Sequence, residues 1–168
     1  MLPETMTVFL PDETATAALA TRCSGSLYAA AAHATQAVTV YLHGDLGSGK
    51  TTFVRGFLRA MGFTGNVKSP TYNLLETYHL PAARVLHFDL YRFHEPQEWE
   101  EAGFDDEMHA PVLALIEWAQ CAEGFVPPAD ISFAFAVQNE GRMCTITPHT
   151  ATGQEMFTAW QNSPDDKF

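Results

Sequence analysis

The chain has 168 residues, 46% of them hydrophobic, so one domain over residues 1–168 with a substantial core is expected. The formal net charge of −11 argues against a broad nucleic-acid-binding surface, which would need clustered lysine and arginine side chains. Three isolated cysteines without metal-ligand spacing fit a reducing, cytoplasmic setting, and no signal peptide or membrane-spanning run is recognisable.

The first predicted elements are a short strand over residues 7–10 and a long helix. Asp12 followed by Glu13 is typical of a capped helix start with an acid in its first turn. An alanine-rich stretch continues to about His33 and is interrupted by Ser24-Gly25-Ser26. Either one helix with a weak point or two short helices would fit this pattern.

Residues 44–51 match the phosphate-binding loop pattern G-x-x-x-x-G-K-[ST]. An apolar run over 37–42 predicts a buried strand before the loop, and apolar residues at helical spacing predict a helix over 51–61 after it. Glycines expose the backbone N–H groups to a phosphate, and the helix N-terminus adds a partial positive charge. The predicted nucleotide-binding residues of this loop are Gly44, Asp45, Leu46, Gly47, Ser48, Gly49, Lys50, Thr51 and Thr52.

Two side chains of the loop have specific roles in this chemistry. Lys50 can reach the β- and γ-phosphates, and Thr51 can place its hydroxyl on Mg²⁺. A bound nucleotide also needs contacts to its base, and the helix that precedes the first core strand is a candidate. We therefore include Glu13 and Thr16, although packing alone would explain that segment.

A glycine- and proline-containing loop is predicted over residues 62–72. Ser69 and Thr71 flank Pro70, and they form either a nucleotide-sensing loop or an ordinary turn. Strands are then predicted over 72–78 and 84–89 as an antiparallel pair.

The second strand of this pair ends in Asp89, which is typical of the acid that holds Mg²⁺ directly or through water. A buried strand over 112–118 ends in a similar way, with Glu117 and Trp118. In open α/β sheets ligands bind outside the carboxyl ends of the strands, so both acids are expected beside Lys50. One acid would hold the metal and the other would orient water, and sequence does not assign which. Trp118 would either stack on the base or pack at the core.

An acidic segment lies between these strands and contains a predicted short helix over 96–102 that stops at Gly103. A solvated acidic face is the simplest interpretation. Trp99 and Phe104 are interleaved with the acids, which would also fit a contact surface for a partner.

The last predicted elements are strands over 131–137 and 143–147, with a turn over 139–142. The remainder, residues 150–168, is expected to be a weakly ordered tail with a weak helix around 155–160 that frays over 163–166.

Five motifs in this order resemble the TsaE family (older name YjeE) over nearly the whole chain from about Leu10 to Thr147. The resemblance implies a P-loop NTPase domain of α/β class, with a mixed central sheet flanked by helices. The matching segments are Leu10–Glu13, Gly44–Thr52, Gly65–Tyr72, His87–Arg92 and Ile116–Trp118.

This resemblance implies a cytoplasmic ATPase of tRNA threonylcarbamoyladenosine (t6A) biosynthesis that needs ATP and Mg²⁺. It further implies slow hydrolysis by the chain alone, association with TsaB and TsaD, and contact with tRNA only through that complex. Thr51 and Glu117 would ligate Mg²⁺, Asp89 would support the metal or the attacking water, and Ser69 and Thr71 would sense the nucleotide. Asp89, Glu117 and Lys50 are thus the expected catalytic residues.

Two other functions remain open at this point. One is a nucleotide-gated interaction module whose hydrolysis is incidental. The other is a small-molecule kinase, although only Arg84, Arg92 and Arg142 follow the phosphate-loop helix and they are dispersed. A GTPase is disfavoured because the N-K-x-D segment that reads guanine is missing.

Overall fold

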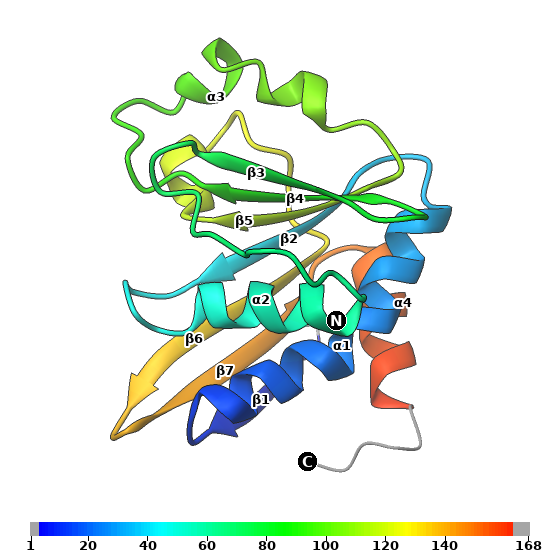
Figure 1. Cartoon of the computed structure of the whole chain (residues 1–168), viewed down its shortest axis with the longest axis vertical. Helices are drawn as coiled ribbons and strands as arrows, with labels where there is room; N and C mark the ends of the chain where they lie inside the picture. Colours follow the sequence, from blue (N-terminus) through cyan, green and yellow to red (C-terminus); the bar gives the residue numbers. More distant parts are fainter. Residues whose placement is uncertain (1–3, 163–168) are drawn as a thin grey trace.

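The computed structural model describes residues 4–162, which form a seven-stranded mixed β-sheet flanked by helices (Figure 1). The chain is therefore of α/β class with a mixed central sheet, as predicted. The strands are β1 (Met6–Leu10), β2 (Val38–His43), β3 (Leu75–His79), β4 (Arg84–Asp89), β5 (Val112–Glu117), β6 (Ile131–Gln138) and β7 (Gly141–Pro148).

The order of the strands across the sheet is β1-β7-β6-β2-β5-β4-β3. The central strands β6, β2, β5 and β4 are parallel, whereas β7, β1 and β3 join the sheet antiparallel. The carboxyl ends of β2, β4 and β5 therefore lie at one edge of the sheet, where α/β proteins bind ligands.

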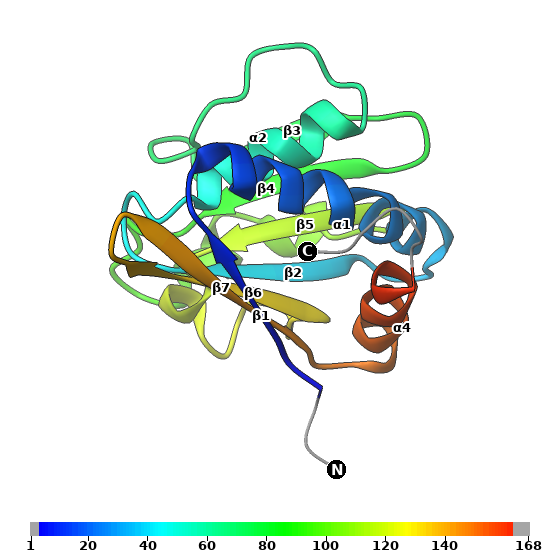
Figure 2. The same ribbon diagram turned by 90° about the horizontal axis from the view of Figure 1, so that it is seen from below.

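Helices cover the two faces of the sheet unequally. On one face lie α1 (Glu13–His33) and α2 (Lys50–Ala60), and α4 (Ala151–Gln161) packs beside α1 (Figure 2). The other face is covered by the short elements α3 (Glu98–Glu101), η1 (Phe104–Glu107) and η2 (Ala119–Ala122).

Side-chain alternation along the central strands produces these two core layers. Leu113 and Leu115 of β5 point to the layer under α1 and α2, whereas Ala114 and Ile116 point to the opposite layer. All four side chains are completely buried, which is typical of a strand covered on both faces.

The N-terminal helix is continuous, so the alternative of two short helices is wrong. Asp12 is its N-cap, and its Oδ1 accepts from the backbone N–H of Ala15 over 2.9 Å. Ser24 does not break the helix, because its side chain is buried and its hydroxyl donates to the carbonyl of Thr21. Packing of α1 against α2 and α4 thus outweighs the weak helix propensity of this stretch.

The strand predicted over 72–78 begins three residues later, at Leu75. Residues 70–74 form a turn that is closed by the N–H of Leu74, which donates to the carbonyl of Pro70 over 2.8 Å. Leu74 adopts a positive φ of 66°, which is incompatible with a strand.

The aromatic residues of the acidic segment face inward, so their interpretation as an exposed contact surface is wrong. Trp99 is completely buried, Phe104 is 7% exposed, and both rings pack against Phe88 of β4. The indole N–H of Trp99 donates to Asp105 over 2.7 Å and so links α3 to η1 over this face of the sheet. The predicted helix is a single turn over Glu98–Glu101, and Gly103, two residues after its end, has a positive φ.

The C-terminal helix α4 begins four residues earlier than predicted and is packed, contrary to the expectation of a weakly ordered tail for this part. Met156, Phe157 and Trp160 are buried in the layer with α1. The predicted fraying over 163–166 lies outside the described residues.

The β6–β7 turn is tight, since Gln138 pairs with Gly141.

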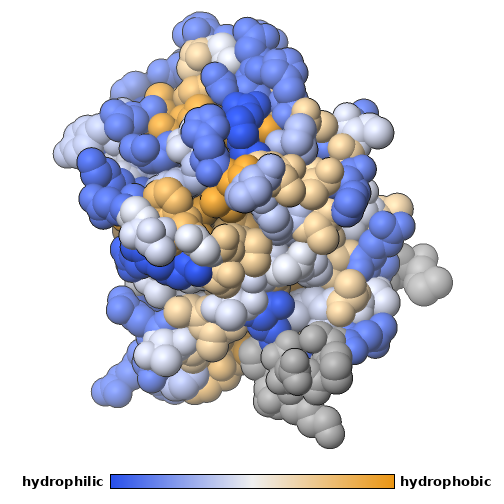
Figure 3. Space-filling model, turned by 45° about the vertical axis from the view of Figure 1, so that its right-hand side comes forward, coloured by the Kyte–Doolittle hydropathy of each residue, from blue (hydrophilic) through white to orange (hydrophobic). Residues whose placement is uncertain are grey.

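Charged and polar residues cover much of the face seen in Figure 3, with smaller hydrophobic patches between them. None of the helices within residues 4–162 is long and apolar enough to cross a membrane.

Candidate nucleotide site

A cleft of about 500 Å³ opens at the carboxyl ends of β2, β4 and β5. It is bounded by the start of α1, the phosphate loop, the 69–71 turn and the β6–β7 hairpin. Its lining residues are Leu10, Pro11, Asp12, Glu13, Thr16, Leu46, Gly47, Ser48, Gly49, Lys50, Thr51, Thr52, Ser69, Thr71, Asp89, Tyr91, Glu117, Glu140, Gly141 and Arg142.

The phosphate loop connects β2 to α2 and depends on glycine at defined positions. Gly49 is the N-cap of α2 and has φ of 110°, a conformation that L side chains rarely adopt. A Cβ on Gly44 would lie only 2.7 Å from the carbonyl oxygen of Phe135, so this position also excludes a side chain. The loop therefore presents backbone and the N-terminus of α2 to the cleft, which suits an anion.

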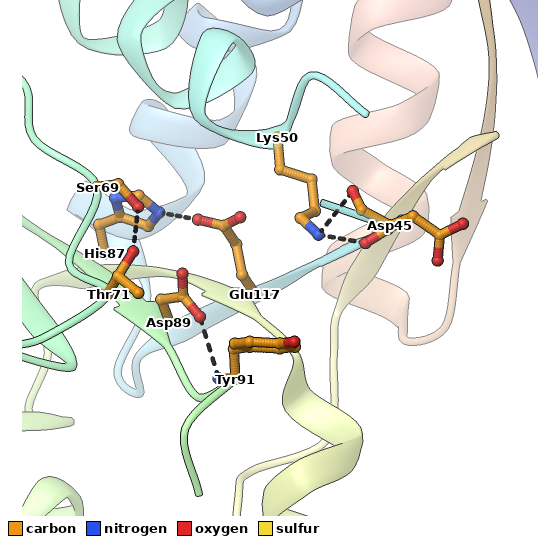
Figure 4. Close-up of polar contacts among 9 residues, drawn as sticks. Asp45, Lys50, Ser69, Thr71, His87, Asp89, Tyr91 and Glu117 are labelled. Atoms are coloured by element: carbon orange, nitrogen blue, oxygen red, sulfur yellow. Dashed lines mark hydrogen bonds and ion pairs between the residues drawn. The ribbon is translucent and has the colours of Figure 1, made fainter. Parts of the chain in front are cut away.

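Lys50 lies at the centre of the site, with its side chain buried beneath the loop (Figure 4). Its ammonium group donates to the carbonyls of Gly44 and Asp45 and lies 4.5 Å from the centre of the Trp118 ring. Burial lowers the pKa of Lys50, and the nearby acids, Glu117 first, partly oppose this shift. The ammonium is thus the cationic centre around which the phosphate loop and the acids are arranged.

Asp89 and Glu117 are register partners on β4 and β5, so they end side by side at this edge of the sheet. Both carboxyl groups are buried. Burial raises the pKa of Asp89, although its Oδ1 accepts from the backbone N–H of Tyr91 over 3.0 Å. Glu117 Oε2 accepts from His87 Nε2 over 2.6 Å (Figure 4).

Ser69 and Thr71 both line the cleft, and their hydroxyl groups are 2.9 Å apart. The turn that carries them follows Val67, which is buried, and faces the acids across the cleft. Both hydroxyl groups therefore lie at the cleft, close to the end of β4 that carries Asp89.

Most of the residues predicted from sequence lie together at this cleft, including Glu13 and Thr16 from α1. Gly44, Asp45 and Trp118 are not among its lining residues. Trp118 has a positive φ of 60° and packs its ring against Tyr91 and the ammonium group of Lys50.

Sequence reasoning did not assign the side chains of His87, Tyr91 and Arg142 to this site. His87 precedes Asp89 by two positions on the same strand, so strand periodicity alone places both on one face. Arg142 carries no comparable local signal, because it reaches the cleft from a hairpin that is more than 90 residues away in sequence from the loop it contacts.

The donor set at the cleft fits Mg²⁺. The hydroxyl of Thr51 and the carboxylates of Asp89 and Glu117 are hard oxygen ligands, the kind that this ion prefers. Within residues 4–162 no group of three or more His, Cys, Asp or Glu side chains could hold a metal by itself. A magnesium ion here would therefore share its coordination with phosphate oxygens and water, as is usual for nucleotide sites.

The fold is of the α/β class, and most residues of the segment that matches the phosphate-binding loop pattern line its cleft. The family model "Threonylcarbamoyl adenosine biosynthesis protein TsaE" matches residues 10–144. The chain belongs to the TsaE family.

Two curated relatives illustrate the extent of this similarity, and both are named tRNA threonylcarbamoyladenosine biosynthesis protein TsaE. The Haemophilus influenzae protein is 37% identical over 159 residues, which covers 95% of this chain and 99% of the relative. The Bacillus subtilis protein is 40% identical over 86 residues, which covers 51% and 53% of the two chains. A crystal structure of Bacillus subtilis YdiB matches with a TM-score of 0.71 over 96% of this chain and 97% of that chain. At 22% identity this structural likeness bears on the fold alone.

Proposed function

We propose that the chain is an Mg²⁺-dependent ATPase of tRNA threonylcarbamoyladenosine biosynthesis. The observation that carries this proposal is the convergence of the phosphate loop with Asp89 and Glu117 on one cleft. Family membership supplies the biosynthetic context, and three cysteines that lie far apart in the sequence suit a cytoplasmic site of action.

Each residue of the cleft has a role in this proposal. The backbone of the loop and Lys50 would bind the β- and γ-phosphates, and Glu13 and Thr16 would contact the base or ribose. Thr51 and Glu117 would hold Mg²⁺, with Asp89 supporting the metal or accepting a hydrogen bond from the attacking water. When bound, Mg²⁺ would neutralise charge on the phosphate oxygens.

The test of this proposal is ATP turnover by the purified chain with and without Mg²⁺. We expect Thr51→Ala and Glu117→Ala each to reduce turnover by about 100-fold or more, because each removes a charge-stabilising contact. Glu123→Ala is the matched control, since Glu123 is an exposed acid that follows η2 and does not line the cleft. Normal turnover in Glu117→Ala would remove this acid from the site.

We further propose that hydrolysis regulates or resets a complex with TsaB and TsaD, through which tRNA is reached indirectly. The strongly acidic composition supports indirect contact with tRNA, because the isolated chain, with a net charge of −11, would repel tRNA. Adding TsaB, TsaD and tRNA should therefore raise the rate of ATP turnover, and tRNA added alone should leave it unchanged.

A nucleotide-gated interaction module is the second candidate, and one observation favours it. Leu46 and Tyr91 line the cleft and are 66% and 45% exposed, so a partner that docks there would sense the nucleotide directly. A variant that binds ATP without hydrolysing it separates the two functions. Multiple rounds of tRNA modification with that variant would support the module over the ATPase cycle.

The kinase alternative gains no support from the positions of the three arginines. Arg84 pairs with Glu107, Arg92 stacks on Tyr72, and Arg142 contacts the phosphate loop. They do not gather into the cationic lid that small-molecule kinases carry.

A further inference from the structure

Arg142 binds the phosphate loop through its guanidinium group. It lies on β7 opposite Leu10 of β1, and it lines the same cleft as the loop. Its Nη2 donates to the carbonyl of Gly47 over 2.9 Å, and its Nε donates to the carbonyl of Ser48 over 3.2 Å. Nη1 donates to the carbonyl of Gly141 over 2.9 Å, which fixes the guanidinium against its own strand.

These bonds determine the orientation of two successive peptide groups. In a trans peptide the C=O and the following N–H point in opposite directions, so the N–H groups of Ser48 and Gly49 point away from Arg142. The N–H of Ser48 donates to the carbonyl of Asp45 over 3.1 Å, which closes the loop on itself. The arginine therefore holds the loop in the curled form that an anion site requires.

Within the described residues no carboxylate forms an ion pair with Arg142. Between described side chains the ion pairs are Arg84–Glu107 and His87–Glu117, and neither involves this arginine. Glu140 lines the same cleft but does not form an ion pair with it. The printed polar partners of the guanidinium are three backbone carbonyls, so Arg142 acts on the loop through the geometry of its hydrogen bonds.

We propose that Arg142 is a positioning residue of the phosphate loop, which pre-organises the peptide groups of Gly47 and Ser48 and so sets nucleotide affinity. This inference rests on the proposed nucleotide binding at the same cleft. It requires the planar fork of arginine, because a lysine ammonium is a point donor and cannot span two carbonyls in fixed geometry.

The test compares Arg142→Met, Arg142→Lys and the wild type by calorimetric titration with ADP in excess Mg²⁺. We expect the Kd to rise about 10-fold or more in Arg142→Met, because two charge-assisted hydrogen bonds are lost. Arg142→Lys should remain close to Arg142→Met although it keeps the charge. The rate at saturating ATP should change less than KM, since the arginine contacts the loop and not the reacting atoms.

Arg84→Met is the matched control, because Arg84 is also a half-buried strand arginine that donates to a backbone carbonyl, that of Glu107. It should bind ADP like the wild type. Wild-type affinity in Arg142→Met would overturn the inference, and so would full recovery in Arg142→Lys, which would show that charge alone suffices.

Hydrogen exchange of the ligand-free protein gives a readout that does not depend on nucleotide binding. We expect the Ser48 amide to exchange about 10-fold faster in both Arg142 variants than in the wild type and in Arg84→Met. Unchanged exchange would overturn the inference. If the wild type fails to bind ADP, the proposed function fails. Faster exchange of the Ser48 amide in the variants would still support the inference that Arg142 orders the loop.

Discussion

At the scale of single residues, the buried hydrogen bond between His87 and Glu117 gives a direct prediction about stability. The imidazole is completely buried, and within residues 4–162 its Nδ1 has no hydrogen-bond partner, whereas its Nε2 bonds to Glu117. Replacing His87 by leucine would leave the Glu117 carboxyl buried and unpaired. We expect this to lower the free energy of unfolding by about 3 kcal/mol. Urea denaturation with the nucleotide omitted measures the effect.

A double-mutant cycle separates this contact from simple repacking. In a Glu117→Leu background the same His87→Leu change should cost much less, because no carboxyl remains to be stranded. An equal cost in both backgrounds would mean that the histidine contributes only packing.

At the scale of secondary-structure elements, Asp130 ties together the starts of β2, β6 and α4. Its Oδ2 accepts from the N–H of Thr39 over 2.9 Å, and its Oδ1 accepts from the hydroxyl of Thr150 over 2.7 Å. Thr150 is in turn the N-cap of α4 and accepts from the N–H of Gly153. This junction brings the first turn of α4 against the backbone of Asp130.

Gly153→Ala tests this junction, because a Cβ at Gly153 would overlap the carbonyl group of Asp130. Alanine normally stabilises a helix by about 1 kcal/mol relative to glycine. Here we expect the opposite sign, a loss of about 2 kcal/mol in the free energy of unfolding. Gly25→Ala in α1 is the control, since a Cβ there meets no atom within 4 Å, and it should stabilise. Stabilisation by both changes would contradict the crowded geometry.

The difference between these two glycines shows where sequence reasoning succeeds and where it stops. Strands and the phosphate loop were predictable, because alternation, glycine spacing and the acids at strand ends are local patterns. The length of α4 was not, since Thr150 and Gly153 depend on Asp130, a contact across 20 residues. The acids of the candidate site were predicted because they end apolar strands, which is a local pattern. Arg142 was not predicted, because its contact with the loop spans more than 90 residues.

At the scale of the whole molecule, the burial of Cys144 on β7 predicts that the free energy of unfolding decreases at alkaline pH. Cys144 lies on this strand, completely buried in the layer with α1 and α4. Burial raises the pKa of its thiol from 9.0 to about 12. The unfolded chain therefore loses this proton at lower pH than the folded chain, so the stability that the thiol contributes is present below about pH 9 and is lost toward pH 12.

Comparison with Cys144→Ala isolates this contribution, because the cavity left by alanine costs the same at every pH. The wild type should lose stability relative to the variant by about 2 kcal/mol between about pH 8 and about pH 10.5, at roughly 1.4 kcal/mol per pH unit above 9. Tyr41, whose pKa burial raises to about 12, is present in both proteins and cancels in the difference. Urea unfolding of both chains at the two pH values measures it. A difference that stays constant would mean that Cys144 ionises as readily in the folded protein as in the unfolded chain, and hence that water reaches this side of the sheet.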